Sequence, residues 1–234
     1  GIGAIVNDVA EMRGCNSVLF LETRKRQDAY MWLGHTNHGS DSGLGPSAKF
    51  LVENIHTMDE LRLTGNCMRG SRPILTFDSE FDKREELKLL KCLFTDVFGT
   101  PRGHPKSKPF VDRVMGFYYA DKKIWVRNYQ IVEEHATNAK DAHTEKKLHG
   151  KAVSTSLVEI GPRFVLNPIR IFRGSFGGQT LYQNDQYVSP NATRAAAKRE
   201  KGNKYAERKI SEKKRKLRHD QIVLPEDPLD SVFK

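Results

Sequence analysis

Cysteine is scarce in this sequence, and it contains no long apolar run. The three cysteines, Cys15, Cys67 and Cys92, are far apart and form no C-x-x-C pair, which argues against a disulfide framework or a cysteine zinc site. No run approaches the roughly 20 consecutive apolar residues of a membrane-spanning helix, and no secretory leader is recognisable. We therefore expect a soluble intracellular protein that makes no contact with a membrane.

The common motifs of catalysis are missing as well. The sequence has no G-x-x-x-x-G-K-[ST] phosphate loop, no G-x-S-x-G nucleophile elbow and no H-E-x-x-H zinc motif. His35 and His38 lie in a Gly/Ser-rich loop that offers no second ligand pair. Glu133 and Glu134 are neighbours on a predicted strand end, so their side chains point to opposite faces. We predict no enzyme activity, no cofactor and no metal site.

Positive charge is abundant but unevenly placed. The 234 residues include 39 Lys or Arg against 29 Asp or Glu, a net charge of +10. Residues 191–219 alone carry +9, so the rest of the chain is almost neutral. The basic residues of this tail are Arg194, Lys198, Arg199, Lys201, Lys204, Arg208, Lys209, Lys213, Lys214, Arg215, Lys216 and Arg218.

The tail has the composition of a helix. It is rich in Ala, Lys, Arg and Glu, it has no proline from Asn191 to Leu224, and Pro190 and Asn191 supply a start signal. We predict a helix that binds nucleic acid, because Lys and Arg displace counterions from a phosphate backbone and relieve their own repulsion. A nuclear import signal at 213–218 and a passive solvated helix face stay open as alternatives.

The remainder combines strand-like runs with two helices. Strands are predicted at 17–22, 29–33, 48–55, 72–77, 113–119, 123–132, 157–160 and 163–172. Helices are predicted at 58–63, with Thr57 as N-cap, and at 83–98, ended by Gly99. The polar stretch 133–156 is predicted to be a loop, and Gly174, Gly177 and Gly178 a turn-rich end. Because the sequence opens on Gly1 and apolar Ile2, we expect the first element to be incomplete.

Basic residues on predicted loops are the candidate RNA contacts. Loops held on a sheet reach a phosphate backbone without disturbing the core. The loop candidates are Arg24, Lys25, Arg26, Arg69, Arg72, Arg102, Lys106 and Lys108; those of the tail are Arg194, Lys198, Arg199, Lys204, Arg208, Lys213, Lys214, Arg215 and Lys216.

Two further candidates come from predicted strands. Trp125, Arg127 and Tyr129 share one strand face, and this face either stacks bases and contacts phosphates or belongs to the core. Arg163 follows Gly161-Pro162 at a strand entrance, where it contacts phosphate or forms a structural salt bridge. The sequence leaves both choices open.

Several runs, in order along nearly the whole chain, resemble the Brix-domain family. They are YMWL (30–33), GPSAKFLV (45–52), NIHT (54–57), LTGNC (63–67), GSRP (70–73), HPKS (104–107), WVRNYQI (125–131), EIGPRFVL (159–166), GSFGG (174–178) and LPEDP (224–228). Judged by this resemblance, residues 1–190 form the Brix domain and 191–234 a basic helical tail. The family's opening strand is missing, and residues 34–45 and 135–156 are insertions without a family role.

The resemblance implies an α/β fold of two intertwined lobes, each similar to an anticodon-binding domain of class II aminoacyl-tRNA synthetases. It also implies a non-enzymatic, RNA-binding assembly factor for the large (60S) ribosomal subunit, which binds precursor rRNA in the nucleolar pre-60S particle and supports rRNA processing. Implied partners are pre-60S ribosomal proteins, other assembly factors and a nucleolar protein resembling the EBNA-binding protein. Two rivals stay open: a protein-interaction scaffold with incidental RNA contacts, and, from the fold analogy alone, a synthetase-like enzyme.

Overall fold

The chain forms two compact units in the computed structural model, Gly1–Tyr187 and Val188–Lys234. The structure describes residues 2–36, 45–61, 71, 73–100, 111–135, 153–223, 229 and 232. Within these residues, no helix has both the length and the apolar character needed to span a membrane.

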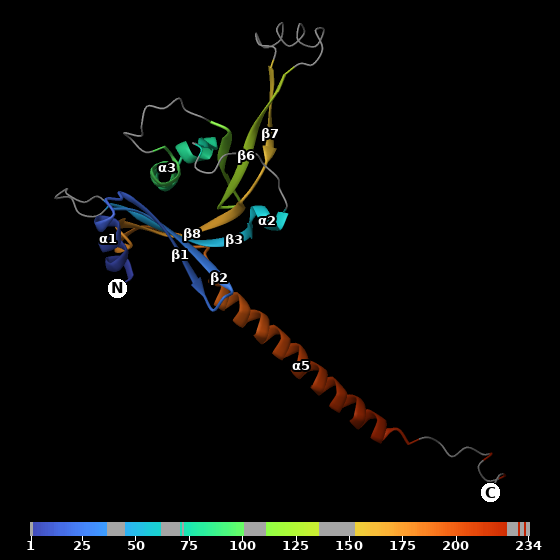
Figure 1. Ribbon diagram of the computed structural model, residues 1–234. Coiled ribbons are helices and arrows are strands. Elements are labelled where there is room, and N and C mark those ends of the chain that lie inside the picture. Colours follow the sequence, from blue (N-terminus) through green and yellow to red (C-terminus); the bar gives the residue numbers. More distant parts are fainter. Residues whose placement is uncertain are drawn as a thin grey trace. The chain divides into compact units, whose positions relative to one another are not determined.

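The first unit is a mixed α/β fold built on one nine-stranded sheet (Figure 1). Its strand order is β1-β2-β3-β8-β6-β5-β4, with β7 paired to β6 and β9 to β8, and only β4 and β5 run parallel. The elements are α1 (Ile2–Met12), β1 (Ser17–Arg24), β2 (Asp28–His35), β3 (Ser47–His56), α2 (Met58–Leu61), β4 (Pro73–Phe77), the 3-10 helix η1 (Ser79–Asp82), α3 (Glu85–Phe98), β5 (Arg113–Ala120), β6 (Lys123–His135), β7 (Val153–Glu159), β8 (Arg163–Gly174) and β9 (Gly177–Gln183).

Strand β8 holds the two halves of the sheet together. It pairs with β3 along one edge, and its residues Phe164–Leu166 pair with Ile124–Val126 of β6 along the other. Farther along β6 the same edge pairs with β7, so β7 and β8 divide one side of β6 and separate at Ile160–Pro162. The buried Asn128 fixes this fork, because its side-chain Nδ2 donates to Pro162 O at 2.8 Å and its backbone carbonyl accepts from Ile160 N at 3.0 Å.

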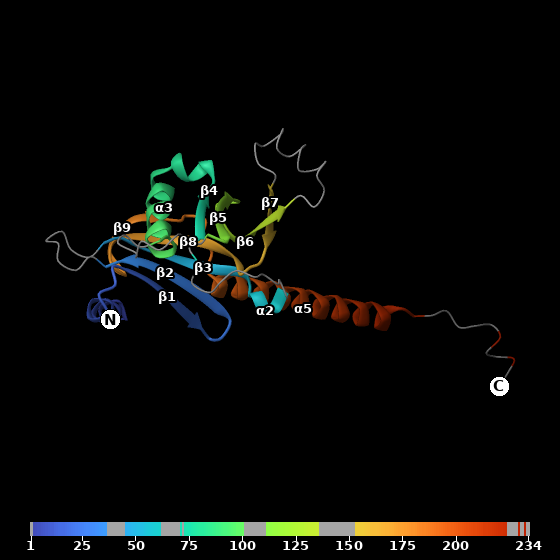
Figure 2. The same cartoon turned by 45° about the horizontal axis from the view of Figure 1, so that its top comes forward.

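Helix α3 covers one face of the sheet (Figure 2) and packs its buried stripe onto the apolar strand residues that form most of the core. Its apolar positions recur at three- and four-residue spacing, which places Leu87, Leu90 and Phe94 on the stripe that faces the strands. The Phe94 ring lies 4.7 Å from that of Phe117 on β5 and 5.9 Å from that of Phe50 on β3. Phe94 therefore connects strands from both halves of the sheet.

The turn between β8 and β9 closes the other face near α1. The buried Ser47 hydroxyl donates to Gly174 O at 2.7 Å and accepts from Phe176 N at 2.8 Å, so one side chain fixes both ends of the turn. A Cβ atom at Gly3 would stand 2.9 Å from the Phe176 side chain, and one at Gly34 would stand 3.0 Å from it. The Phe176 Cβ atom therefore leaves no room for a side chain at position 3, and its ring leaves little at position 34.

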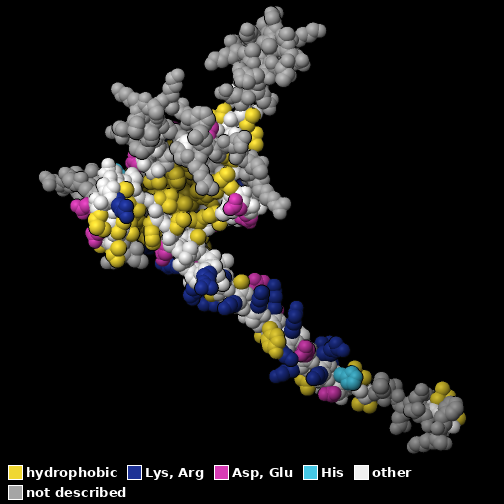
Figure 3. Space-filling view, viewed as in Figure 1, with side chains coloured by type: hydrophobic (Ala, Val, Ile, Leu, Met, Phe, Trp, Pro, Cys, Tyr) yellow, Lys and Arg dark blue, Asp and Glu magenta, His cyan; other side chains and the backbone are white. Residues whose placement is uncertain are grey.

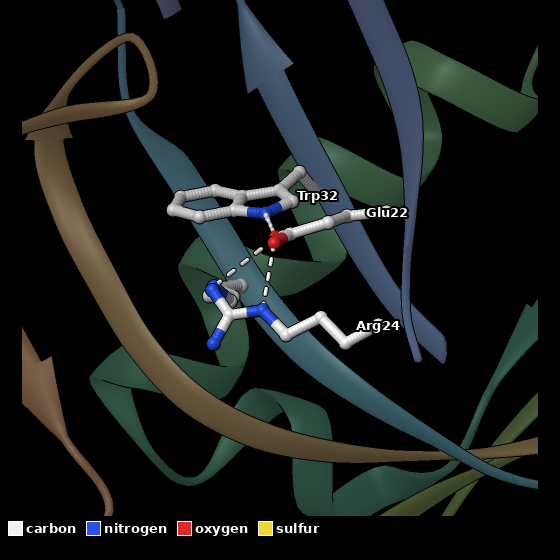
Figure 4. Close-up of polar contacts among 4 residues, drawn as sticks. Glu22, Arg24 and Trp32 are labelled. Carbon is white, nitrogen blue, oxygen red and sulfur yellow. Dashed lines mark hydrogen bonds and ion pairs between the residues drawn. The ribbon is translucent and has the colours of Figure 1, made fainter. Parts of the chain in front are cut away.

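An ion cluster occupies the same face within the β1–β2 hairpin (Figure 4). Glu22 accepts from Arg24 Nε at 2.8 Å and from Trp32 Nε1 at 3.4 Å, and Lys49 Nζ lies 3.4 Å from it. Burial raises the pKa of Glu22, but the hydrogen bonds from Arg24 and Trp32 and the charge of Lys49 outweigh this, so its pKa lies below the usual value. The charged carboxylate consequently stabilises the folded hairpin.

The predicted helices are confirmed, with small changes at their ends. Helix α2 begins after Thr57, whose Oγ1 accepts from Glu60 N at 3.3 Å as an N-cap does. Helix α3 begins two residues later than expected and ends before Gly99. All eight predicted strands are present within a few residues of their expected bounds. The loop tip at 37–44 lies outside the described residues.

Three expectations need correction. Residues 133–135 and 153–156 are strand, not loop, because the backbones of β6 and β7 pair as far as His135 and Val153; this pairing requires no apolar pattern. Residues 2–12 form a helix that we did not anticipate, although Ile2, Ile5, Val6 and Val9 have helical spacing. The glycine-rich end continues into an additional strand, β9.

The second unit consists largely of one long helix, α5 (Pro190–Gln221), as the tail composition predicts. Ser189 caps it by accepting from Ala192 N at 3.3 Å, and Pro190 occupies the first turn, where its missing N–H costs nothing. The helix has 32 residues and none is buried within its unit. At a rise of about 1.5 Å per residue, it is roughly 48 Å long.

Substitution of Phe94 by Ala tests the aromatic core. We expect Phe94→Ala to lower the free energy of unfolding by about 3–5 kcal/mol, because a fully buried ring leaves a cavity between the two halves of the sheet. Urea unfolding measures the change. The control is Lys88→Ala on the exposed side of α3, which should shift stability by less than about 0.5 kcal/mol. A Phe94→Ala loss no larger than that of the control would contradict this account of the core.

The Glu22 cluster predicts a pH-dependent stability. A carboxylate with a depressed folded pKa stabilises the protein above its unfolded pKa, near 4.5, and this contribution is lost as the pH falls through the folded value. Glu22→Gln should therefore be less stable than the parent at pH 7, and the difference should shrink below about pH 4.5. Thermal unfolding across this range checks it, with Glu11→Gln on the exposed side of α1 as control. A difference independent of pH would exclude the charge as its origin.

Candidate nucleic-acid interface

The sheet face away from α3, called here the distal face, collects aromatic and charged side chains. Alternation along β6 separates the two faces: Ile124 and Val126 are buried in the core under α3, whereas Trp125, Arg127 and Tyr129 are half-buried on the distal face. Strand register carries the same face across the sheet. Its charged and aromatic members include Glu22, Arg24, Tyr30, Trp32, Lys49, Glu53, Lys123, Trp125, Arg127, Tyr129, Glu159, Arg163 and Arg170.

The structure shows on which face of the sheet the candidate cluster of β6 lies. Trp125, Arg127 and Tyr129 share one face, as the alternation predicts, and this face is not the α3 core. Burial raises the pKa of Tyr129, and its interaction and hydrogen bond with Tyr118 raise it further, so its hydroxyl stays protonated and is already engaged with Tyr118. On this face, Trp125, Arg127 and Tyr129 remain partly exposed to solvent, because helix α3 covers the opposite face.

Carboxylates on the distal face organise its basic residues. Glu53 accepts from Lys123 Nζ at 2.6 Å and from Asn167 Nδ2 at 3.1 Å. Glu159 lies 2.9 Å from Arg127 Nη1 and 3.8 Å from Arg163 Nη1. Arg163, the first residue of β8, is thus in a salt bridge. Because each guanidinium has five N–H donors and these contacts use one nitrogen of each arginine, both retain donors for a further acceptor.

The β1–β2 hairpin presents Lys25 and Arg26 at its exposed tip. Both have left-handed backbone conformations, with φ of 51° and 55°, in a turn closed by Gln27 N donating to Arg24 O at 3.0 Å. This geometry matches the twist of the strands but is disfavoured for residues with a Cβ atom, for which Asn-Gly is the usual solution. Neither side chain forms an ion pair within the described part of the chain, in contrast to Arg24, which pairs with Glu22.

Charge on α5 is distributed around the helix (Figure 3). Lys213, Lys214, Arg215 and Lys216 are consecutive, and since successive residues turn by about 100°, their side chains point to all sides. A few pairs are satisfied locally, as between Lys204 and Glu200 at 2.6 Å. Positive charge on this helix is therefore not confined to one face.

Not every sequence candidate is placed by the structure. Arg69, Arg72, Arg102, Lys106 and Lys108 lie outside the described residues. The structure also adds three basic residues that were not singled out, Lys49, Lys123 and Arg170. Lys49 Nζ lies 4.5 Å from the Trp32 ring and 4.9 Å from that of Tyr30, and it pairs in register with Arg170. The alternation of polar and apolar residues along this strand could have placed Lys49 on the solvent side. The sequence could not show which rings lie beside it, because Trp32 and Tyr30 belong to another strand.

Comparison with known proteins identifies the family. The Brix domain model matches residues 4–170. A Xenopus laevis protein named ribosome biogenesis protein BRX1 homolog is 49% identical over 231 residues, which are 98% of this chain and 61% of that protein. An Arabidopsis thaliana protein named ribosome biogenesis protein BRX1 homolog 2 is 50% identical over 218 residues, 93% of this chain and 64% of that protein. The chain thus spans about three fifths of the length of these relatives.

A crystal structure of a probable ribosomal biogenesis protein from Aeropyrum pernix K1 aligns with 69% of this chain and 73% of its own, at 12% identity and a TM-score of 0.40. The decisive match is that of the domain model, which covers well over half of the chain. With relatives about 50% identical along nearly all of its length, the chain belongs to the Brix-domain family.

Proposed function

We propose that this chain is a non-enzymatic RNA-binding assembly factor of ribosome biogenesis. It acts on precursor rRNA of the large (60S) subunit in the nucleolar pre-60S particle and supports rRNA processing. The observation that carries the proposal is the exposed 32-residue helix α5, which holds all twelve basic residues of the tail, in a family whose matched relatives are named ribosome biogenesis proteins. Its partners would be pre-60S ribosomal proteins, assembly factors and a nucleolar protein resembling the EBNA-binding protein.

Within this proposal, α5 provides affinity and the Brix domain provides placement. Charge that surrounds a helix recognises phosphate without regard to sequence, and it weakens as salt displaces it. The Brix domain contributes the Lys25–Arg26 tip and the distal face, which are fixed in shape by strand pairing. Because side chains do not read the narrow major groove of A-form RNA, RNA shape and unpaired nucleotides are the features to be recognised.

The two-lobed arrangement is part of the proposal. One lobe would comprise β1–β3 with β8 and β9, and the other β4–β7. Support comes from the chain order: β8 follows β7 in sequence yet pairs with β3, so the chain returns to the first group of strands after building the second. We also propose residues 1–190 as the Brix domain, 191–234 as the tail, and 34–45 and 135–156 as insertions.

A protein-interaction scaffold is the second candidate, and one observation favours it. On β7, which is paired to β6, Leu157 and Val158 are 55% and 48% exposed within the described structure. An exposed apolar strand can bind a partner strand or helix. If this function dominates, Leu157→Ser and Val158→Ser should abolish association with pre-60S particles in sedimentation, while basic substitutions leave it intact.

The salt dependence of RNA binding tests the role of α5. Replacing Lys213, Lys214, Arg215 and Lys216 with Gln should reduce the slope of log K against log salt by up to about 3–3.5, since each lost phosphate contact removes roughly 0.7–0.9. Fluorescence anisotropy with a labelled rRNA fragment at several KCl concentrations measures it. The control replaces Ala195, Ala196 and Ala197 with Gln, which alters the same helix without changing its charge. An unchanged slope in the first variant would contradict the proposal for α5.

Substitutions at the tip of the β1–β2 hairpin should change protein stability and RNA affinity in opposite directions. Lys25→Asn with Arg26→Gly supplies the residues that the turn prefers, so stability should rise while RNA affinity falls about equally for all sequences. The matched control is Asp121→Asn with Lys122→Gly in the β5–β6 turn, where φ is 53° and 59°. That change removes one acid and one base, so it should raise stability and leave RNA affinity unaltered. Equal RNA affinities for both double variants would exclude the tip as a contact.

A further inference from the structure

A pocket of about 240 Å³ lies on the distal face beside the fork of β7 and β8. We call it the fork pocket. It is lined by Asn54, His56, Trp125, Arg127, Arg163, Phe164 and Val165. Its position follows from the fold, because β6 exchanges one neighbouring strand for another at this point and the strands diverge.

The β3 side of the fork pocket is shaped by an irregularity in the strand. The register between β3 and β8 shifts between Glu53 and His56, and Asn54 adopts a left-handed conformation with φ of 47°. The shift displaces the end of β3 from the regular ladder, as a bulge does. His56 is held there by its Nδ1, which lies 3.2 Å from the Glu60 carboxylate of α2. The β3 wall of the pocket is thus set by this backbone irregularity and by the contact between His56 and Glu60.

The pocket presents hydrogen-bond donors that lack acceptors. Trp125 Nε1 is buried and has no partner among the described residues. A buried indole N–H normally finds an acceptor, so this donor beside the pocket is unsatisfied within the described part of the chain. Arg127 and Arg163 share the Glu159 carboxylate through one nitrogen each, which leaves further guanidinium N–H groups and a net positive charge beside the pocket.

We propose that the fork pocket binds one unpaired nucleotide of RNA, with the base against Trp125 and the phosphate on Arg127 and Arg163. This inference rests on the proposed RNA-binding function and names its site of contact on the sheet. The volume is below the roughly 300 Å³ of drug-sized sites, which suits one base and excludes a duplex. A tryptophan beside arginines combines a surface for a base with donors for a phosphate, as single-stranded RNA sites require.

The indole N–H of Trp125 gives a direct readout. The chain has two tryptophans, so its ¹H–¹⁵N spectrum contains two indole signals, and Trp32→Phe assigns the one from Trp125. We would titrate the ¹⁵N-labelled full chain with the four ribonucleoside 5′-monophosphates, with inorganic phosphate and with the unphosphorylated nucleosides. We expect at least one monophosphate to shift the Trp125 signal saturably, at about tenfold lower concentration than inorganic phosphate or the nucleoside.

Variants of the arginines assign the phosphate contact. Arg163→Gln should raise the half-saturating concentration roughly tenfold, the effect of about 1.4 kcal/mol. Glu159 keeps Arg127 at 2.9 Å in this variant, so the fork should remain folded. Arg163→Lys, which retains the charge but not the guanidinium, should lose less. The control is Arg173→Gln, an exposed arginine of the same strand that belongs neither to the pocket nor to the distal-face set, which should change nothing.

The outcomes separate this site from the proposed function. No shift with any monophosphate, an equal response to inorganic phosphate, or equal losses in Arg163→Gln and Arg173→Gln would each overturn the nucleotide site. Binding of the labelled rRNA fragment by the same sample is measured in parallel by anisotropy. RNA binding with a silent Trp125 signal overturns the fork pocket alone, whereas absence of RNA binding overturns the proposed function itself.

Discussion

The pairing of β8 with both β3 and β6 is the constraint on which the rest of this structure depends. β3 and β6 are distant in sequence, and only β8 contacts both as a sheet neighbour. Without it, the Phe50 and Phe117 rings would lose the shared plane on which Phe94 packs. The fork at Asn128 also exists because β8 occupies only the first part of the β6 edge. Core, register and pocket thus share one origin.

The two faces of the sheet differ in character because α3 covers only one of them. Under α3 the side chains are apolar, because the helix stripe removes them from water. On the distal face, carboxylates hold lysines and arginines beside Tyr and Trp rings, as Glu22 holds Lys49 next to Trp32. Such pairs contribute little to stability when exposed, yet they fix the positions of cations that a ligand contacts. A phosphate-bearing partner would find donors there that are already ordered.

The chain divides RNA recognition, as proposed, between two kinds of surface. Helix α5 has charge on all sides and no buried residue within its unit, so its interaction with a polyanion depends on charge density more than on shape. The Brix domain places cations by backbone geometry, at the strained tip of Lys25 and Arg26 and around the fork pocket. Affinity and positioning can therefore change independently.

Local sequence determined much of this protein, and the reason is that the relevant forces are local. Alternation in β6, the α3 stripe, the Thr57 cap and the composition of α5 each depend on residues within a few positions, so the elements and the basic helix were predictable. The family, too, was recognisable from short runs in order. The unexpected strand ends at His135 and Val153 show the limit, since they exist through pairing with each other.

Tertiary structure alone decided which distant residues became neighbours. Trp125, Arg163 and Asn54 belong to three strands, and only the register of β8 against β3 and β6 brings them to one pocket. The register of β2 against β3 placed Lys49 on the Trp32 ring, and that of β6 against β7 and β8 gave Glu159 two arginines. Sequence determines which residues can pair; the order of strands in the sheet, which depends on long-range packing, determines which ones do.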